Sequence, residues 1–103
     1  MKEFDLFVPL TFNDGEPIPA SLFQSLQRRL LSRFGGLTFF PQPNRGFWKM
    51  GDVTYRDEIV VYRVISANAV ASRQYLAKLK KWMLREFRQE EILIIQRSIG
   101  LID

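Results

Sequence analysis

The stretch GFWKMGDVTYRDE, residues 46–58, gathers aromatic, basic and acidic side chains within one short segment. Trp48 can supply a stacking wall for a ligand, in a cleft that Tyr55 also lines. Lys49 and Arg56 can hold an anion, and Glu58 can act as a general base. The structural alternative is a hairpin in which the tryptophan covers the edge of the core and the charges pair across strands. We predict ligand-binding residues in this stretch, with Glu58 as a candidate catalytic residue, and keep the hairpin as the alternative.

A second polar group, Gln89, Glu90 and Glu91, follows the second predicted helix. Acidic side chains at the C-terminal end of a helix oppose its dipole, so a nearby cation is expected to compensate them. Arg56, Lys49 or a partner chain could supply that cation. The two polar groups would then meet at one end of a sheet and form one site, with Gln89 binding the ligand and Glu90 as a second candidate catalytic carboxylate. The alternative is a solvated turn.

Two residue types are missing altogether, because the chain contains no cysteine and no histidine. Disulfides, thiolate nucleophiles and cysteine zinc sites are therefore excluded. The residue most often used as a general acid or base near neutral pH is also missing. An enzyme built from this chain must use carboxylates, lysine, tyrosine or backbone groups. The candidates are a metal-dependent nuclease, with a hard cation on carboxylates, and a cofactor-free enzyme that uses Glu58 and Glu90. We predict no metal site and no cofactor, and keep such an enzyme as the first alternative to a binding module.

The charge balance is mildly basic, with a formal net charge of +4 and a pI near 9.8. A basic stripe on the second predicted helix could grip the phosphates of a nucleic acid. Its members are Lys78, Lys81, Arg85 and Arg88. Most such stripes are the solvated side of an amphipathic helix, and the chain lacks the aromatic signature of RNA-recognition domains. Nucleic-acid binding is therefore the second alternative.

Period-2 and period-3.6 patterns predict four strands and two helices that position these side chains. In chain order they are a strand over 3–12, a helix over 19–34, a short strand over 37–40, a strand over 54–65, a helix ending near 88 and a strand over 92–99. PQPNRG, residues 41–46, is expected to break the short strand, and FWKM either continues it or forms a small strand of its own. The order β-α-β-β-α-β predicts an α+β ferredoxin-like plait, a four-stranded antiparallel sheet with both helices on one face. No linker divides the chain, so residues 1–103 are predicted to form a single domain.

The ends of both predicted helices carry capping signals. Ser21 with Gln24 resembles a capping box at the start of the first helix. Gly35 is expected to end that helix, because glycine readily adopts the left-handed conformation. Ser66 or Asn68 is the expected N-cap of the second helix.

Two helices can cover only one face of such a sheet, yet apolar residues are predicted on both faces of the strand over 54–65. On that strand Val60, Tyr62 and Val64 alternate with Ile59, Val61 and Ile65. A large apolar patch rarely stays exposed on a soluble monomer. We predict a homodimer packed through the open sheet face, and a small-molecule pocket between sheet and loops is the alternative.

Several short motifs spread over nearly the whole chain. They are VPL, DG-x-P-I, RFGG-L-T, G-x-W, RDE-x-x-V and F-x-QE-x-x-L-I. This string resembles a family of small uncharacterised bacterial proteins, a domain of unknown function with a ferredoxin-like plait. The resemblance implies the same fold and no particular activity. Its recurring positions correspond here to Gly46, Trp48, Arg56, Glu58, Gln89 and Glu90.

The first residues, MKEFDLFVPL, hold acidic side chains within their apolar run and no small-residue cleavage site. Apolar runs elsewhere are only a few residues long, far short of the roughly 20 that a membrane span needs. We therefore expect a cytoplasmic protein without membrane contact. The leading hypothesis is a homodimeric module that binds a small anionic ligand or a protein partner near residues 46–58 and Glu90.

Overall fold

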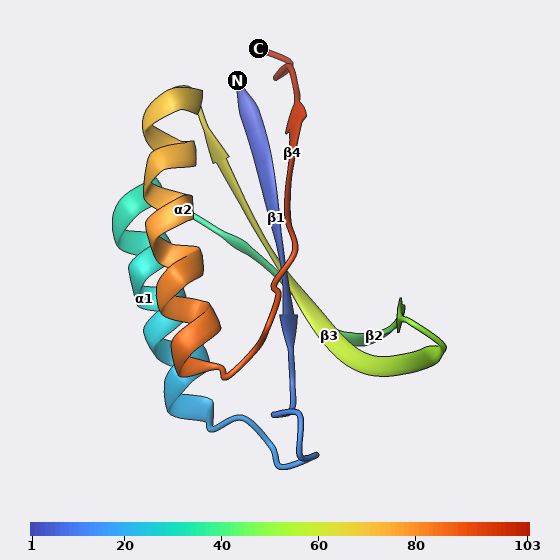
Figure 1. Ribbon diagram of the computed structural model, residues 1–103. Coiled ribbons are helices and arrows are strands. Elements are labelled where there is room, and N and C mark those ends of the chain that lie inside the picture. Colours follow the sequence, from blue (N-terminus) through green and yellow to red (C-terminus); the bar gives the residue numbers. More distant parts are fainter.

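The computed structural model describes all residues, 1–103, as one layer of sheet and one layer of helices (Figure 1). The elements are β1 (Lys2–Pro9), α1 (Ala20–Phe34), β2 (Thr38–Met50), β3 (Val53–Ser66), α2 (Ala69–Glu86) and β4 (Ile94–Ser98). The predicted β-α-β-β-α-β order is confirmed.

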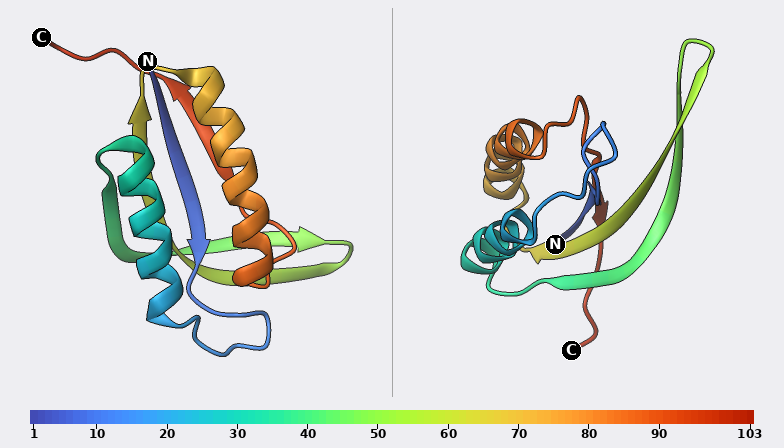
Figure 2. Two further views of the ribbon diagram at one scale, coloured as in Figure 1. Left: turned by 90° about the vertical axis from the view of Figure 1, so that its left-hand side faces the viewer. Right: turned by 90° about the horizontal axis from the view of Figure 1, so that it is seen from below.

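The four strands form one antiparallel sheet in the order β2-β3-β1-β4, so β1 and β3 are central and β2 and β4 are edges. β1 pairs with β3 along its whole length, from Lys2↔Ser66 to Pro9↔Ile59. Both helices lie on one face of the sheet (Figures 1 and 2). We call the face without helices the open face. The predicted α+β class, with four antiparallel strands and two helices, is confirmed.

The core lies between the sheet and the helices, because every second residue of the central strands points that way. The strands contribute Phe4, Leu6, Val8, Val60, Tyr62 and Val64. The helices and the turn after α2 contribute Leu26, Leu30, Leu76, Leu79, Met83 and Phe87. Full burial of one large apolar side chain contributes roughly 1.5–3 kcal/mol to folding. This packing decides which face of the sheet is covered and which is left open.

The helix ends agree with two of the three capping predictions. Gly35 ends α1 with φ 76°, and Asn68 caps α2 by accepting a hydrogen bond from the Ala71 amide. Ser66 instead accepts a hydrogen bond from the amide of Asn68. The predicted capping box of Ser21 is wrong. Pro19 is the N-cap and Ser21 already lies within the helix, so no side chain caps this end.

The predicted break of β2 at residues 41–46 is also wrong. β2 continues to Met50, with a bulge between Phe40 and Asn44 that contains two prolines. An edge strand tolerates prolines, because the missing amide donor can face away from the sheet. Two other boundaries move inward: β1 ends at Pro9 and β4 begins at Ile94.

The β2–β3 hairpin continues past the point where β1 ends. We call residues 45–58, which have no third strand beside them, the arm. Its strands pair from Arg45↔Glu58 to Met50↔Val53. Gly51 in the turn has φ 62°, which glycine adopts without steric cost. Figures 1 and 2 show the arm projecting away from the helices.

Candidate functional site

The predicted aromatic site residues lie on the arm and contact each other. The rings of Trp48 and Tyr55 are stacked, with centroids 4.5 Å apart and an angle of 18° between the planes. The Trp48 indole N–H donates a 2.8 Å hydrogen bond to Asp57 Oδ2. Trp48 is 41% exposed, so it does not cover the edge of the core as the hairpin alternative assumed. Its ring is held in place by neighbours on the arm alone.

The charged site residues of the arm are weakly engaged. The nearest nitrogen of Arg56 lies 4.0 Å from Glu58 Oε1, and both side chains are about half exposed. Lys49 forms no ion pair, and no hydrogen bond or ion pair joins the arm to Glu90. No group of three or more acidic residues could hold a metal ion.

The polar group after α2 is compensated within the helix layer. Lys80 of α2 lies 2.6 Å from Glu91 Oε1. This hydrogen bond, with one from the Ile92 amide, lowers the pKa of Glu91. Gln89 donates to the carbonyl oxygens of Thr11, at 3.2 Å, and Phe87, at 2.9 Å. The compensating cation therefore comes from Lys80 rather than from Arg56 or Lys49, and the two predicted polar groups do not form one site within a chain.

The basic stripe is only partly continuous. Lys78 and Lys81 are exposed on α2, whereas Arg85 lies 3.5 Å from Glu86. Arg88 lies beyond the helix end, in the left-handed region with φ 51°. Its guanidinium stacks over the Phe12 ring, 4.8 Å from the centroid. Arg88 therefore does not extend the helical stripe.

A cluster that the sequence analysis missed lies on the open face. Asp5 of β1 is 3% exposed, and three hydrogen bonds bind its carboxylate. Arg63 of β3 donates two, from Nε at 2.8 Å and Nη2 at 3.1 Å. Arg97 of β4 donates the third from Nη1 at 2.8 Å. Glu3 joins the cluster, 2.9 Å from Arg63 Nε and 3.4 Å from Arg97 Nη1.

The electrostatics of this cluster favour the ionised forms. The hydrogen bond from Arg63 lowers the pKa of Asp5 below its usual value, although burial opposes the shift and Arg97 adds to it. The same pairing raises the pKa of Arg63. Two carboxylates balance two guanidinium groups, so Glu3, Asp5, Arg63 and Arg97 carry no net charge together.

The cluster borders a groove of about 390 Å³ on the open face. Its lining residues are Asp5, Phe7, Phe40, Gln42, Asn44, Val61 and Arg63. β3 supplies the floor, because it lies between β1 and β2, which supply the walls. The Arg63 guanidinium lies 5.0 Å from the centre of the Phe40 ring. The groove thus combines apolar surfaces with the amide groups of Gln42 and Asn44.

The expectation of a continuous apolar open face is corrected by this cluster. Arg63 follows Val61 and precedes Ile65 on the same side of β3, and Asp5 lies directly opposite it on β1. The period-2 pattern contains this information, because odd-numbered residues of both strands share the open face. The sequence signal for the cluster was an acidic residue, Asp5, and a basic residue, Arg63, at facing positions of two otherwise apolar strands.

Comparisons with known proteins establish the fold. No family model and no curated protein matches the chain. A phage SAM lyase, solved in complex with S-methyl-5'-thioadenosine, is 15% identical with a TM-score of 0.71, covering 94% of this chain and 80% of that one. A mutant of CutA1 from Pyrococcus horikoshii OT3 is 12% identical with a TM-score of 0.62, covering 100% of this chain and 87% of that one. Both similarities support a ferredoxin-like type of α+β fold. In this chain, neither helix has the length and apolar character needed to cross a membrane.

Proposed function

We propose that the protein is a homodimeric binding module whose ligand occupies the open-face groove. The observation that carries this proposal is the buried Asp5 carboxylate, held by Arg63 and Arg97 beside a groove with aromatic walls. Removing charges from water costs several kcal/mol per ion, and an ion pair repays this only with good geometry. A sheet face that served packing alone would carry apolar residues at these positions.

The residues of the groove favour a neutral ligand with a flat apolar face and a hydrogen-bonding edge. Phe7 and Phe40 offer apolar contact surfaces. The Gln42 side-chain amide offers donors and an acceptor. Asn44 Nδ2 already donates to the Gln42 carbonyl oxygen at 3.3 Å, which leaves Asn44 one donor and its acceptor for a ligand. Because the nearby charges cancel, the groove favours a neutral ligand over the anion expected from the sequence. A nucleoside has this chemistry, and the similar phage SAM lyase was solved with S-methyl-5'-thioadenosine.

A second copy packed on the open face would close the groove. Several apolar side chains around it are exposed in one chain: Phe40, Ile65 and Leu93. Apolar surface that borders a polar cluster is typical of interaction sites. The homodimer predicted from the sequence is therefore part of this proposal.

The proposal is tested by calorimetric titration with adenosine, S-methyl-5'-thioadenosine and ribose 5-phosphate. We expect the two nucleosides to bind more tightly than the phosphate. Asn44→Ala should weaken nucleoside binding about tenfold, the equivalent of one good hydrogen bond. Arg45→Ala is the matched control, because Arg45 is the next residue of β2 and is absent from the groove lining. Nucleoside binding weaker than about 1 mM, or equal effects of the two variants, would overturn the proposal.

A further inference from the structure

The arm exposes large apolar side chains that no other element of the chain covers. They are Phe47, Trp48, Met50, Val53 and Tyr55, with Phe47 66% exposed. A two-stranded ribbon without a third strand or a helix against it is marginally stable in water. Apolar exposure of this extent on a projecting hairpin is typical of a surface that binds another chain.

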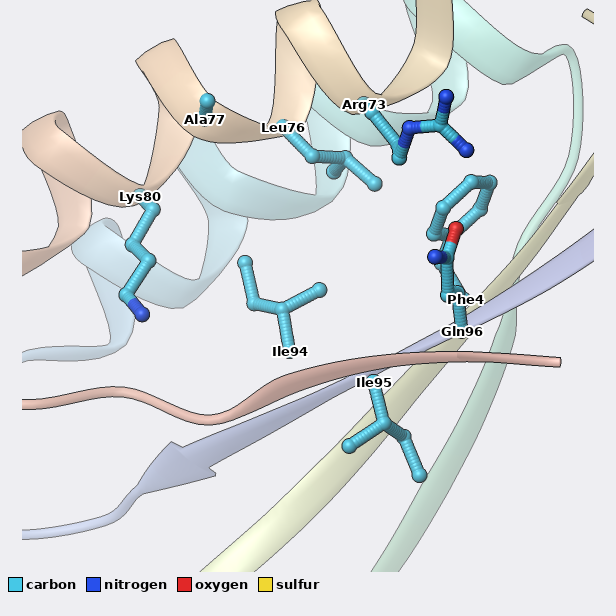
Figure 3. Close-up of a pocket in the computed structure, with 8 residues that line it drawn as sticks. All are labelled: Phe4, Arg73, Leu76, Ala77, Lys80, Ile94, Ile95 and Gln96. Carbon is cyan, nitrogen blue, oxygen red and sulfur yellow. The ribbon is translucent and has the colours of Figure 1, made fainter. Parts of the chain in front are cut away.

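A second uncovered surface lies at the opposite edge of the sheet. A groove of about 270 Å³ runs between α2 and β4, and Phe4, Leu76, Ala77 and Ile94 form most of its apolar lining. Figure 3 shows Arg73 and Lys80 projecting from α2 at its two ends, with Ile94 pointing toward the helix and Ile95 away from it. The groove is an apolar channel with a cation at each end.

The two edges of the sheet differ in how they are protected. The β2 edge carries Pro41 and Pro43 within a bulge, and both features hinder pairing with another strand. The β4 edge, Ile94–Ser98, contains neither proline nor lysine and pairs only with β1. An unprotected edge strand is a template for strand addition by another chain. β4 is therefore the edge open to a partner.

We propose that the arm of one copy lies along the β4 edge and the α2–β4 groove of a second copy. The arm of the second copy makes the same contact with the first. One chain cannot make this contact by itself, because the arm extends from the β2 side of the sheet and β4 is the far edge. A reciprocal contact closes a twofold dimer. The inference rests on the homodimer of the proposed function, adds a contact at the edges of the sheet to the packing of its open faces, and is independent of its ligand.

The charges of the two surfaces are complementary. Lys49, which has no partner within its own chain, can pair with the exposed Glu90 of the second copy. Asp52 at the turn of the arm can pair with Arg73. The aromatic rings of the arm also suit Arg73 at one end of the groove, whereas Lys80 at the other end is already paired with Glu91. The residues near 48 and 90 would then form one site across two copies.

The first test uses engineered cysteines, which are unique because the natural chain has none. Val53→Cys and Ala77→Cys are made in separate chains, mixed, and treated with a short bis-maleimide. We expect a covalent heterodimer, because Val53 lies on the arm and Ala77 lines the groove. Lys78→Cys replaces Ala77→Cys as the control, because Lys78 is exposed outside the groove lining. Equal cross-linking of the two α2 variants would overturn the contact.

The second test measures dimer dissociation by light scattering and sedimentation. Lys49→Glu and Glu90→Lys should each weaken the dimer about tenfold, and the double variant should recover most of the affinity. A dimer unaffected by these changes would overturn the arm contact and leave the ligand proposal standing. A chain that is monomeric at about 100 μM, far above a typical dissociation constant, would overturn both the contact and the homodimer. Nucleoside titration of the same variants then reports separately on the open-face groove.

Discussion

The two faces of the sheet use alternate residues of the same strands but are stabilised differently. On the covered face, Phe4 and Leu6 pack beneath the helices. On the open face, the intervening Asp5 is equally buried, yet arginine side chains rather than helices cover it. Burial of a strand residue therefore does not require a second layer of secondary structure. Long basic side chains from neighbouring strands can supply it.

The largest effect is expected on the covered face. Leu6→Ala should lower the free energy of unfolding by about 2–5 kcal/mol, because it leaves a cavity in a fully buried site. Phe7 is the next residue of β1 and lies on the open face. Phe7→Ala should lower the free energy of unfolding by less than Leu6→Ala, because Phe7 is only half-buried in one chain. Urea unfolding followed by circular dichroism measures both. Equal losses would mean that the open face is as well covered in solution as the helix face.

The next largest effect concerns the polar cluster. Asp5→Asn should lower the free energy of unfolding by about 1–3 kcal/mol, because it removes the charge that binds two guanidinium groups. Solvent limits the loss, since the Arg63 side chain is 33% exposed. Asp57→Asn changes a partly exposed carboxylate on the arm and keeps a side-chain oxygen that can accept the Trp48 indole N–H, so it should stay within about 0.5 kcal/mol of wild type. If Asp5→Asn were equally harmless, the cluster would not stabilise the open face.

The smallest effect is the pH dependence of the difference in unfolding free energy between wild type and Asp5→Asn. The hydrogen bond from Arg63 holds the pKa of Asp5 below its ordinary value of 3.8, so the folded state binds this proton more weakly than the unfolded state. The stabilisation is then complete above pH 3.8 and is lost as pH falls through the lower folded-state value. The unfolding free energies of wild type and Asp5→Asn should therefore converge as the pH falls below 3.8. If the difference in unfolding free energy between the two proteins grew in acid, the pKa of Asp5 would be shifted in the opposite direction.

The sequence predicted the elements because their local patterns were strong. Leu76, Leu79 and Met83 recur at helical spacing, and all three are buried. The predicted break of β2 was wrong, because an edge strand tolerates the prolines at 41 and 43. Which strand lies at the edge depends on tertiary pairing, which the local pattern does not contain.

The candidate site was harder to predict than the fold. Trp48, Tyr55 and the charges of the arm attracted attention because they are close in sequence. The open-face cluster instead joins Asp5 to residues 58 and 92 positions away. Such partners become visible only when the strand order and register are known, because many registers are compatible with one alternating pattern.

The pairing of β1 with the last strand also affects how the chain folds. Lys2 is opposite Ser98, so β4 joins the sheet through one of the longest loops that this chain can close. Helices and the β2–β3 hairpin form from nearby residues, whereas such distant pairing is slow. β4 is therefore expected to pair with β1 late in folding. Until then the Asp5 carboxylate would lack its hydrogen bond from Arg97. The folding rate should then depend on β1–β3 contacts, and the unfolding rate on contacts made by β4.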